Sequence, residues 1–231
     1  MANGIGLMIF ATARYRMFLE GVVATARRHW HTTLPLSIVT FTDEIPSRWI
    51  SDLRLPTPHA DWPLVTLLRY RHIYEVAAEL RRFDYLLMCD VDMEFVGEIG
   101  DEILGDLVAT RHAGHTEKTQ AQLPYIRMRH STAWVPKDKG LAYYAGGFQG
   151  GRTADYLEAC RHMAEAITED EKLNYIADWH DESHWNAYLA NVQPAGVELS
   201  PAYCWPSEWD RNPETKILAL SKEHAAMREK C

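Results

Sequence analysis

The order of strand-like and helix-like segments in the sequence predicts an α/β fold built around a central sheet. Three short apolar runs, at Ile5–Phe10, 36–41 and Tyr85–Cys89, have the length and composition of buried strands. Two longer segments, 17–30 and 64–82, place apolar side chains near helical spacing, so we expect amphipathic helices packed on the sheet. Alternating strands and helices indicate a mostly parallel arrangement, in which ligands bind at the carboxyl ends of the strands.

The second half of the sequence is less regular. We expect a short helix over residues 97–104, a strand over 107–110 and a polar connection over 114–130. Residues 142–151 form an aromatic, strand-like run that contains two Gly-Gly pairs. Glycines inside a strand let a ligand or another backbone come close to the chain.

The remaining segments are expected to form two helices and a tail. Thr153 has the residue type of an N-cap and predicts a helix that reaches about Ile167, and a second short helix is expected to start near Asp181. Residues 206–231 hold few apolar side chains and end in several basic ones, so we expect a mobile flap or a frayed end.

Composition excludes several classes of protein. With 231 residues, of which 47% are hydrophobic and 24% charged, the chain can bury an ordinary globular core. Its formal charge of −8 and its scattered Lys and Arg argue against a nucleic-acid-binding surface. The four cysteines are far apart and form no CxxC pair, which argues against a zinc site or a disulfide framework. Because no signal peptide or apolar span near twenty residues is present, we expect a cytoplasmic protein without a transmembrane segment.

Two aspartates follow the run Tyr85–Cys89 at the point where it stops. Asp90 and Asp92 are two residues apart, so on an extended chain both side chains leave the same face, while Val91 faces the other way. Paired carboxylates at the carboxyl end of a central strand suit a divalent cation that also holds the phosphates of a ligand. Acidic pairs at strand ends also cap loops, so this motif alone leaves both interpretations open.

A second acidic segment, WHDESHWN at 179–186, combines two acids, two histidines and two tryptophans. In a purely structural interpretation Asp181 caps a helix, Glu182 is solvated and Trp179 and Trp185 belong to the core. In a functional interpretation the aromatic rings cover the apolar face of a sugar, while the acids and histidines bind its hydroxyl groups.

Five segments in order along nearly the whole chain resemble the motifs of glycosyltransferase family 6. This is the family of the histo-blood-group A and B transferases and of the α1,3-galactosyltransferase. The segments are DVDMEF at 90–95, PKD at 136–138, YYAGGF at 143–148, WHDESH at 179–184 and LSP at 199–201. Without a membrane anchor or stem, the chain resembles the short, soluble bacterial or phage-borne members of the family.

The resemblance implies a GT-A fold in a single catalytic domain over residues 1–231. A Rossmann-like region with a mixed central sheet, residues 1–96, is then mainly UDP-binding, and residues 97–231 mainly bind the acceptor and supply a C-terminal flap. The implied reaction moves GalNAc or Gal from UDP-GalNAc or UDP-Gal, with retention of configuration and with Mn²⁺. The product is an α1,3 linkage to a galactose- or GalNAc-containing glycan, with or without fucose.

The resemblance also implies roles for particular residues. Glu182 matches the carboxylate beneath the reacting anomeric carbon, as a nucleophile or as a stabiliser of oxocarbenium charge. Asp90 and Asp92 match the pair that binds Mn²⁺ and UDP. The other residues implied to bind UDP are Phe10, Ala11, Tyr15, Val65, Arg69, Val91, Lys222, His224 and Arg228. Those implied to bind the donor sugar or the acceptor are His112, Ala145, Gly146, Gly147, Trp179, His180 and Asp181.

Donor choice and metal dependence follow from two of these motifs. In the family, the strand that holds Ala145, Gly146 and Gly147 lies against the C2 substituent of the donor sugar, and Gly147 leaves room for an N-acetyl group. UDP-GalNAc is therefore expected over UDP-Gal. Many bacterial relatives replace the aspartate pair by asparagines, whereas this chain keeps Asp90 and Asp92, so metal dependence is expected.

At one position the chain departs from the family. Where other members have an acceptor-binding Asp after the LSP segment, this chain has Pro206, which supplies no carboxylate. Either Glu208 or Asp210 substitutes for it, or the acceptor differs.

Two other classes of protein also fit part of the pattern. A haloacid-dehalogenase-type phosphohydrolase places Asp-x-Asp after an apolar strand, but it normally has Thr or Val where this chain has Glu94. A non-enzymatic carbohydrate-binding protein would use the aromatic residues, but it would not need Asp90, Asp92 and Glu182 together.

Overall fold

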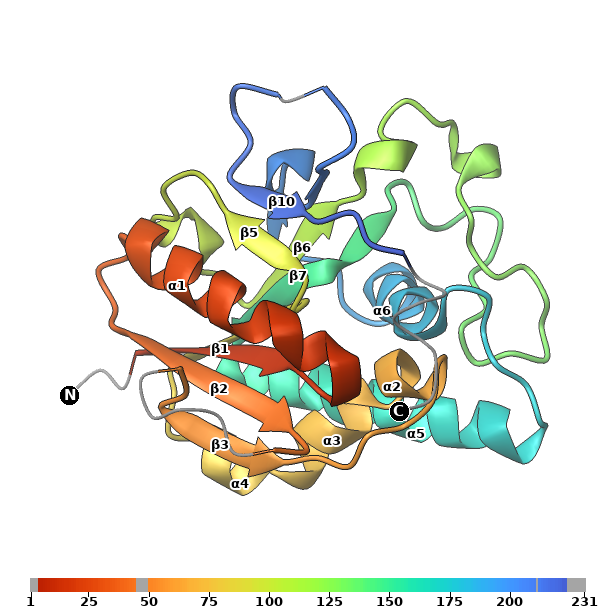
Figure 1. Cartoon of the computed structure of the whole chain (residues 1–231). Helices are drawn as coiled ribbons and strands as arrows, with labels where there is room; N and C mark the ends of the chain where they lie inside the picture. Colours follow the sequence, from red (N-terminus) through yellow and green to blue (C-terminus); the bar gives the residue numbers. More distant parts are fainter. Residues whose placement is uncertain (1–3, 45–49, 211, 224–231) are drawn as a thin grey trace.

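The computed structural model describes residues 4–44, 50–210 and 212–223, and its centre is a seven-stranded mixed sheet (Figure 1). The strand order is β3-β2-β1-β4-β7-β6-β8. The strands are β1 (Ile5–Phe10), β2 (Leu36–Thr42), β3 (Leu53–Pro56), β4 (Tyr85–Cys89), β6 (Leu107–Arg111), β7 (Tyr144–Arg152) and β8 (Val197–Leu199). Strands β3, β2, β1 and β4 are parallel, whereas β7 runs antiparallel to both β4 and β6. The predicted α/β class with a mixed central sheet is therefore confirmed.

Both faces of the sheet are buried, which explains why its central strands read as continuous apolar runs. All six residues of β1 are buried. Leu7 and Ile9 point into one hydrophobic cluster, while Met8 and Phe10 point into the other. The fold is thus a three-layer sandwich, with the sheet between two layers that each need an apolar face.

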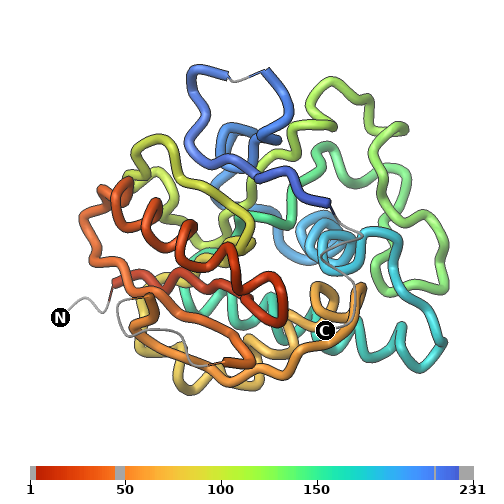
Figure 2. Tube along the Cα trace, viewed as in Figure 1, coloured from red at the N-terminus to blue at the C-terminus, as the bar shows by residue number. Residues whose placement is uncertain are grey.

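One outer layer is formed by helix α1 and a small second sheet. Helix α1 (Leu19–His29) buries Leu19, Val22, Val23 and Ala26 against the central sheet. The second sheet has the order β5-β10-β9, with β5 (Met93–Phe95), β9 (Trp205–Pro206) and β10 (Ile217–Ala219). Because β10 pairs with β5, the end of the described chain is held beside the carboxyl end of β4 (Figures 1 and 2).

The opposite layer is formed by the other helices. These are α2 (Leu64–Leu67), α3 (Arg69–Glu75), α4 (Ala77–Leu80), α5 (Thr153–Lys172) and α6 (His180–Asn191). A third cluster, which includes Leu123, Tyr125, Val135 and Tyr143, packs the long segment between β6 and β7 against Ala187 of α6. Short 3₁₀ turns lie at Ala13–Phe18, Asp101–Ile103, Ala113–His115, Gln120–Gln122 and Pro201–Tyr203. In the part of the chain that the structure describes, no helix has the length and apolar character needed to cross a bilayer.

The helix predicted over 64–82 is divided into three, and its buried residues explain the breaks. The fully or nearly buried side chains are Leu67, Tyr70, Ile73, Ala77 and Leu80. Their mean spacing is shorter than the 3.6 residues of an α-helical turn, so one continuous helix would rotate the later side chains away from the core. The backbone leaves the α conformation between these helices and so restores the apolar face.

Five other expectations are corrected. Helix α1 begins at Leu19 rather than at residue 17, and the helix predicted over 97–104 is only a 3₁₀ turn. Arg152, not Thr153, is the N-cap residue of α5, because the Thr153 hydroxyl donates instead to the Phe83 carbonyl (2.7 Å). Helix α5 also continues past Ile167 to Lys172. The expected flap includes a buried strand, since Ile217 of β10 has no exposed surface.

Candidate active site

The two aspartates lie just beyond the carboxyl end of β4, in a turn rather than on an extended strand. Strand β4 ends at Cys89, and the backbone N–H of Asp90 donates to the Gly147 carbonyl of β7 (2.9 Å). This bond fixes Asp90 beside the glycine pair of β7. The expected alternation of side chains along an extended chain is therefore wrong here, although both carboxylates still reach the same cleft.

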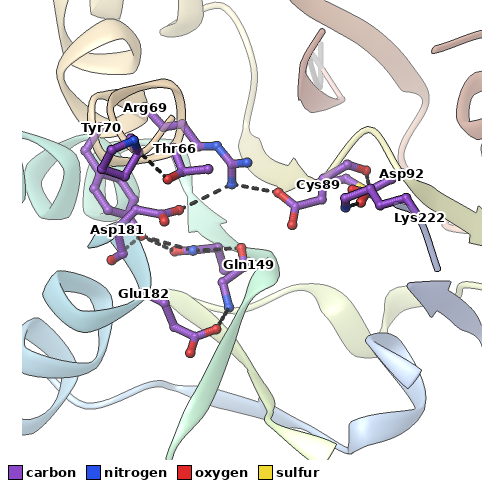
Figure 3. A network of polar contacts seen from close by, with 12 residues as sticks. Thr66, Arg69, Tyr70, Cys89, Asp92, Gln149, Asp181, Glu182 and Lys222 are labelled. Atoms are coloured by element: carbon purple, nitrogen blue, oxygen red, sulfur yellow. Dashed lines mark hydrogen bonds and ion pairs between the residues drawn. The ribbon is translucent and has the colours of Figure 1, made fainter. Parts of the chain in front are cut away.

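Arg69 connects the aspartate turn to helix α6. Its Nη1 atom lies 2.6 Å from Asp90 Oδ1 and 3.3 Å from Asp181 Oδ2, and Figure 3 shows its guanidinium group between Asp181 and the end of β4. Burial alone would lower the pKa of Arg69, but the two carboxylates outweigh burial and raise that pKa above its ordinary value. Arg69 is therefore a permanent positive charge beside the acids.

Glu182 lies one residue beyond Asp181, on the same first turn of α6. Its Oε2 atom accepts a hydrogen bond from the backbone N–H of Gly146 (2.8 Å). Burial, together with the charge of Asp181, raises the pKa of Glu182 to about 8, against the lowering effect of the Gly146 N–H. Burial also raises the pKa of Asp181 to about 6, although Arg69 opposes that shift.

A buried polar group supports this arrangement from behind. Gln149 of β7 donates from Nε2 to the Tyr70 hydroxyl and to the Gly146 carbonyl, both at 3.1 Å (Figure 3). The Tyr70 hydroxyl is in turn 3.4 Å from the carbonyl of Asp181. Helix α3, strand β7 and helix α6 are thereby connected at the base of the cleft, so the first turn of α6, which carries Glu182, is held in place.

Two cavities meet at the aspartate turn. The smaller, of about 140 Å³, is lined by Phe10, Thr12, Tyr15, Trp62, Val65, Thr66, Arg69, Asp90, Val91, Asp92 and Lys222. The larger, of about 510 Å³, is lined by Asp90, Asp92, Met93, His112, Ala145, Gly147, Glu182, Cys204, Pro206, Ser207, Glu208, Ala219, Leu220, Ser221 and Lys222. Of the described residues that line these cavities, Asp90, Asp92 and Lys222 line both. A ligand that fills both cavities therefore passes these three side chains.

Cavity size alone would not have identified this site. A cavity of about 760 Å³ lies at the other end of the sheet, between Tyr85 at the start of β4 and Arg152 at the end of β7. The carboxylate cleft is distinguished instead by its buried acids and by its position at the carboxyl end of β4.

Comparison with known proteins gives the family. The family model described as glycosyltransferase family 6 matches residues 1–229. The chain belongs to this family. It is 33% identical to the rat histo-blood group ABO system transferase 1, over 97% of this chain and 68% of the relative. It is 32% identical to the human globoside alpha-1,3-N-acetylgalactosaminyltransferase 1, over 94% of this chain and 65% of the relative.

A bacterial relative is similar in length. The chain is 27% identical to the O-antigen biosynthesis glycosyltransferase WbnI of Escherichia coli, over 95% of both chains. By contrast, it spans about two thirds of the two mammalian relatives. Membership in family 6 confirms the resemblance in the sequence motifs, and it favours the transferase interpretation over a phosphohydrolase or a carbohydrate-binding protein.

Most of the residues implied by the family 6 motifs lie in or beside the two cavities. Phe10, Tyr15 and Val65 line the smaller one, and His112, Ala145 and Gly147 line the larger one. Burial and the neighbouring His115 lower the pKa of His112 to about 4, so its ring is neutral at pH 7. Gly146 contributes its N–H to Glu182 rather than a cavity wall.

Four implied residues have other surroundings. Ala11 is fully buried in the core behind the smaller cavity. Trp179 is half exposed, and the His180 ring contacts Trp62 edge-on, with ring centroids 4.9 Å apart. His180 also has a φ of 50°, a left-handed conformation that is uncommon for a residue other than glycine. Asp181 is buried against Arg69 and is not the N-cap of α6, so the structural interpretation is wrong for Asp181, whereas Trp185 is a core residue as that interpretation expected. His224 and Arg228 lie outside the described residues.

The structure adds Met93 and Cys204 to the family 6 site. A Cβ atom built on Gly147 would overlap the Met93 methyl group and would lie 3.2 Å from Cys204 Sγ and 3.3 Å from Asp90 Oδ2. These two side chains therefore limit the space in front of Gly147. Sequence reasoning missed them because a lone Met and a lone Cys resemble core residues.

The structure distinguishes Glu208 from Asp210, the two candidates to replace the acceptor-binding aspartate that is missing at Pro206. Glu208 lines the larger cavity, and its carboxylate accepts a hydrogen bond from the Ser221 hydroxyl. Asp210 instead uses its backbone carbonyl to accept a hydrogen bond from Trp205 Nε1 (3.2 Å), and its side chain is exposed. Glu208 is therefore the carboxylate that the cleft presents beside Pro206.

The donor set fits a divalent cation that is shared with a diphosphate. Asp90 and Asp92 offer hard oxygen atoms, which suit Mn²⁺. Within residues 4–44, 50–210 and 212–223, no group of three or more His, Cys, Asp or Glu side chains is arranged to hold a metal ion. The protein would thus supply two ligands, and phosphate and water oxygens would supply the others.

Proposed function

We propose that this family 6 member is a retaining transferase that moves GalNAc, or Gal, from a UDP-sugar onto a galactose- or GalNAc-containing glycan in α1,3 linkage, with Mn²⁺. The observation that carries the proposal is the pair of cavities that share Asp90, Asp92 and Lys222, with Glu182 on the wall of the larger one. A nucleotide sugar has the matching order of parts, namely a base, a diphosphate and a hexose.

The smaller cavity suits the nucleoside. Phe10 and Tyr15 supply aromatic surface, Val65 an aliphatic contact and Thr12 a hydroxyl group. A cavity with mainly apolar walls and a few polar groups is typical of small-molecule sites. We assign residues 1–96 mainly to UDP binding and residues 97–231 mainly to acceptor binding.

The shared wall suits the diphosphate. Arg69 and Lys222 lie beside Asp90 and Asp92, so two cations and two acids meet where the phosphates would pass. Bound Mn²⁺ would act there as a Lewis acid that lowers the cost of losing UDP. Arg69 keeps Asp90 in place through its ion pair, while its own orientation is fixed by Asp181.

Glu182 suits the anomeric carbon. When the bond to UDP breaks, positive charge develops on the sugar ring, and an anion on the opposite face stabilises it or attacks it. The Gly146 N–H holds the Glu182 carboxylate, and Glu182 faces the same cavity as Gly147 and the aspartates. Retention of configuration follows if Glu182 acts on the face opposite to UDP.

Gly147 and His112 suit the two sugars. Gly147, with Met93 and Cys204 in front of it, lines the larger cavity of about 510 Å³, and we infer that this cavity takes the N-acetyl group of UDP-GalNAc. His112 and Glu208 lie on the same cavity and can bind acceptor hydroxyl groups. The name of the human relative, a globoside alpha-1,3-N-acetylgalactosaminyltransferase, supports the same donor and linkage.

A donor screen tests the proposal. UDP release is measured with UDP-GalNAc, UDP-Gal and other UDP-sugars, with Mn²⁺ or with chelator, and with plain and fucosylated galactosides as acceptors. We expect release from UDP-GalNAc that requires Mn²⁺ and increases with an acceptor. If no UDP-sugar supports release, the protein is not the transferase proposed here.

A further inference from the structure

Each aspartate of the turn after β4 is already in contact with a cation from another part of the chain. Asp90 contacts Arg69, and Asp92 contacts the Lys222 ammonium through its Oδ2 atom. Both partners of the second pair are largely buried, with 16% of the Lys222 side chain and 11% of the Asp92 side chain exposed. Lys222 is therefore not a surface lysine that happens to pass an acid.

The segment that carries Lys222 is attached to Asp92 a second time. The backbone N–H of Leu220 donates to the Asp92 carbonyl (2.9 Å), and the N–H of Ser221 donates to the Ser207 hydroxyl oxygen (2.9 Å). The Lys222 ammonium also lies over the Tyr15 ring, 5.6 Å from its centroid. The end of β10 thus brings Lys222 to the junction of the two cavities, where it contacts the Asp92 carboxylate and the Tyr15 ring.

An ammonium group on a carboxylate oxygen and a metal ion on the same oxygen exclude each other. We propose that Lys222 is an internal cation that occupies the metal-binding oxygen of Asp92 until the diphosphate draws it away. Divalent metal alone must displace the Lys222 ammonium from the Asp92 carboxylate, whereas metal and UDP together offer Lys222 the phosphate oxygens in exchange. Metal and nucleotide binding are therefore coupled through Lys222, and the coupling is reciprocal.

This inference rests on the proposed function, because it takes Asp90 and Asp92 as the metal ligands, but its test does not need transfer activity. Binding of Mn²⁺ alone is measured by electron paramagnetic resonance for the wild type and for Lys222→Met. We expect Lys222→Met to bind Mn²⁺ about tenfold more tightly, a size typical of coupling between sites. The same variant is expected to bind UDP about tenfold more weakly in the presence of saturating Mn²⁺, because the phosphates lose a cation.

The matched control is Lys216→Met. Lys216 lies in the same segment but pairs with Glu102 (2.7 Å), so this variant removes the same charge without touching Asp92. We expect its Mn²⁺ and UDP affinities to equal those of the wild type. Equal tightening of Mn²⁺ binding in both variants would indicate a general charge effect and would overturn the inference, as would no tightening in Lys222→Met.

The failure of this inference can be separated from the failure of the proposed function. If the wild type releases UDP from UDP-GalNAc with Mn²⁺ but Lys222→Met binds Mn²⁺ no better than the wild type, only the role of Lys222 is wrong. If no UDP-sugar is turned over, the transferase proposal is wrong whatever the Mn²⁺ affinities are.

Discussion

At the scale of single residues, the buried environment of Glu182 disfavours the ionised form that its proposed role needs. Its carboxylate needs to be ionised to stabilise positive charge, yet burial raises its pKa to about 8. Since kcat/KM reports ionisation in the free enzyme, we expect kcat/KM to increase with pH up to about 8 and then to level off. A profile that is flat from pH 6 to pH 9 would contradict this assignment.

Replacing the carboxylate should separate catalysis from stability. We expect Glu182→Gln to lower kcat by about 10²–10³-fold, the usual effect of losing one charge that stabilises a transition state. Binding of UDP, measured by calorimetry, should change little, because the smaller cavity does not include Glu182. A variant with unchanged turnover would remove Glu182 from the mechanism.

The same variant should be more stable than the wild type in alkali. The folded pKa of Glu182 is raised above its ordinary value, so its contribution to stability is fully present below about pH 4.5 and is lost as the pH rises through about 8. Glu182→Gln carries no charge to bury. We expect its free energy of unfolding at pH 9 to exceed that of the wild type by about 1 kcal/mol or more, or about 2–4 °C in Tm. Thermal melts at pH 5 and pH 9 check this, and equal shifts at both values would contradict it.

Gly147 should control donor choice through space alone. A Cβ atom there would meet Met93, Cys204 and Asp90, so Gly147→Ala narrows the cavity in front of the donor sugar. We expect kcat/KM for UDP-GalNAc to fall relative to UDP-Gal by about tenfold or more, the usual effect of one carbon atom in a specificity pocket. The control is Gly21→Ala in α1, where an added Cβ meets nothing within 4 Å and should leave the donor ratio unchanged. Equal losses with both donors would show that Gly147 does not face the C2 substituent.

At the scale of elements, a buried acid on helix α5 holds the segment between β6 and β7 in place. Asp170 accepts hydrogen bonds from the Ser131 hydroxyl (2.8 Å) and the Thr132 N–H (2.7 Å), and His184 Nε2 lies 3.9 Å from it. Asp170 and His184 are each 2% exposed. Asp170 therefore joins helix α5 to the segment between β6 and β7, beside the buried His184 of α6.

Removing the Asp170 carboxylate should lower the free energy of unfolding far more than removing the neighbouring Glu169 carboxylate. We expect Asp170→Ala to lower the free energy of unfolding by about 2–4 kcal/mol, since it leaves buried donors without partners. The control Glu169→Ala breaks only an exposed pair with Lys172 and should cost less than about 0.5 kcal/mol. Urea denaturation of both variants checks the difference, and similar midpoints would contradict a structural role for Asp170.

Strands and helices with a local signal were predicted, and those without one were missed. The periodicity of residues 19–29 and the apolar runs of β1, β2 and β4 are properties of consecutive residues, so the sequence was enough to predict them. Strand β10 has only three residues and pairs with β5, more than one hundred positions earlier. Such a strand exists because of its partner, so a single sequence gives little sign of it.

At the scale of the whole molecule, the candidate site is assembled where α3, β4, β7, α6 and β10 meet. The motifs around Asp90, Gly147 and Glu182 each stand in one short segment, and they were predicted as candidate site residues on that basis. The ion pair of Arg69 with Asp181 joins residues 112 positions apart, and Gln149 reaches Tyr70 across 79. These contacts depend on how the layers pack, so neither spacing nor residue type could have predicted them.

Because Asp92 lines both cavities, its loss should uncouple metal from nucleotide across the site. Asp92→Asn keeps the shape of the side chain but removes the charge that faces both cavities. We expect Mn²⁺-dependent UDP release to fall by about 10²-fold and chelator to have little further effect, since loss of a ligating carboxylate removes most of the metal's contribution. The control Asp106→Asn changes an exposed acid paired with Arg152 near the other end of the sheet, and it should turn over donor like the wild type. UDP release is followed for all three proteins with Mn²⁺ and with chelator. Full activity of the wild type in chelator would show that Arg69 and Lys222, held by the two acids, bind the diphosphate without a metal ion.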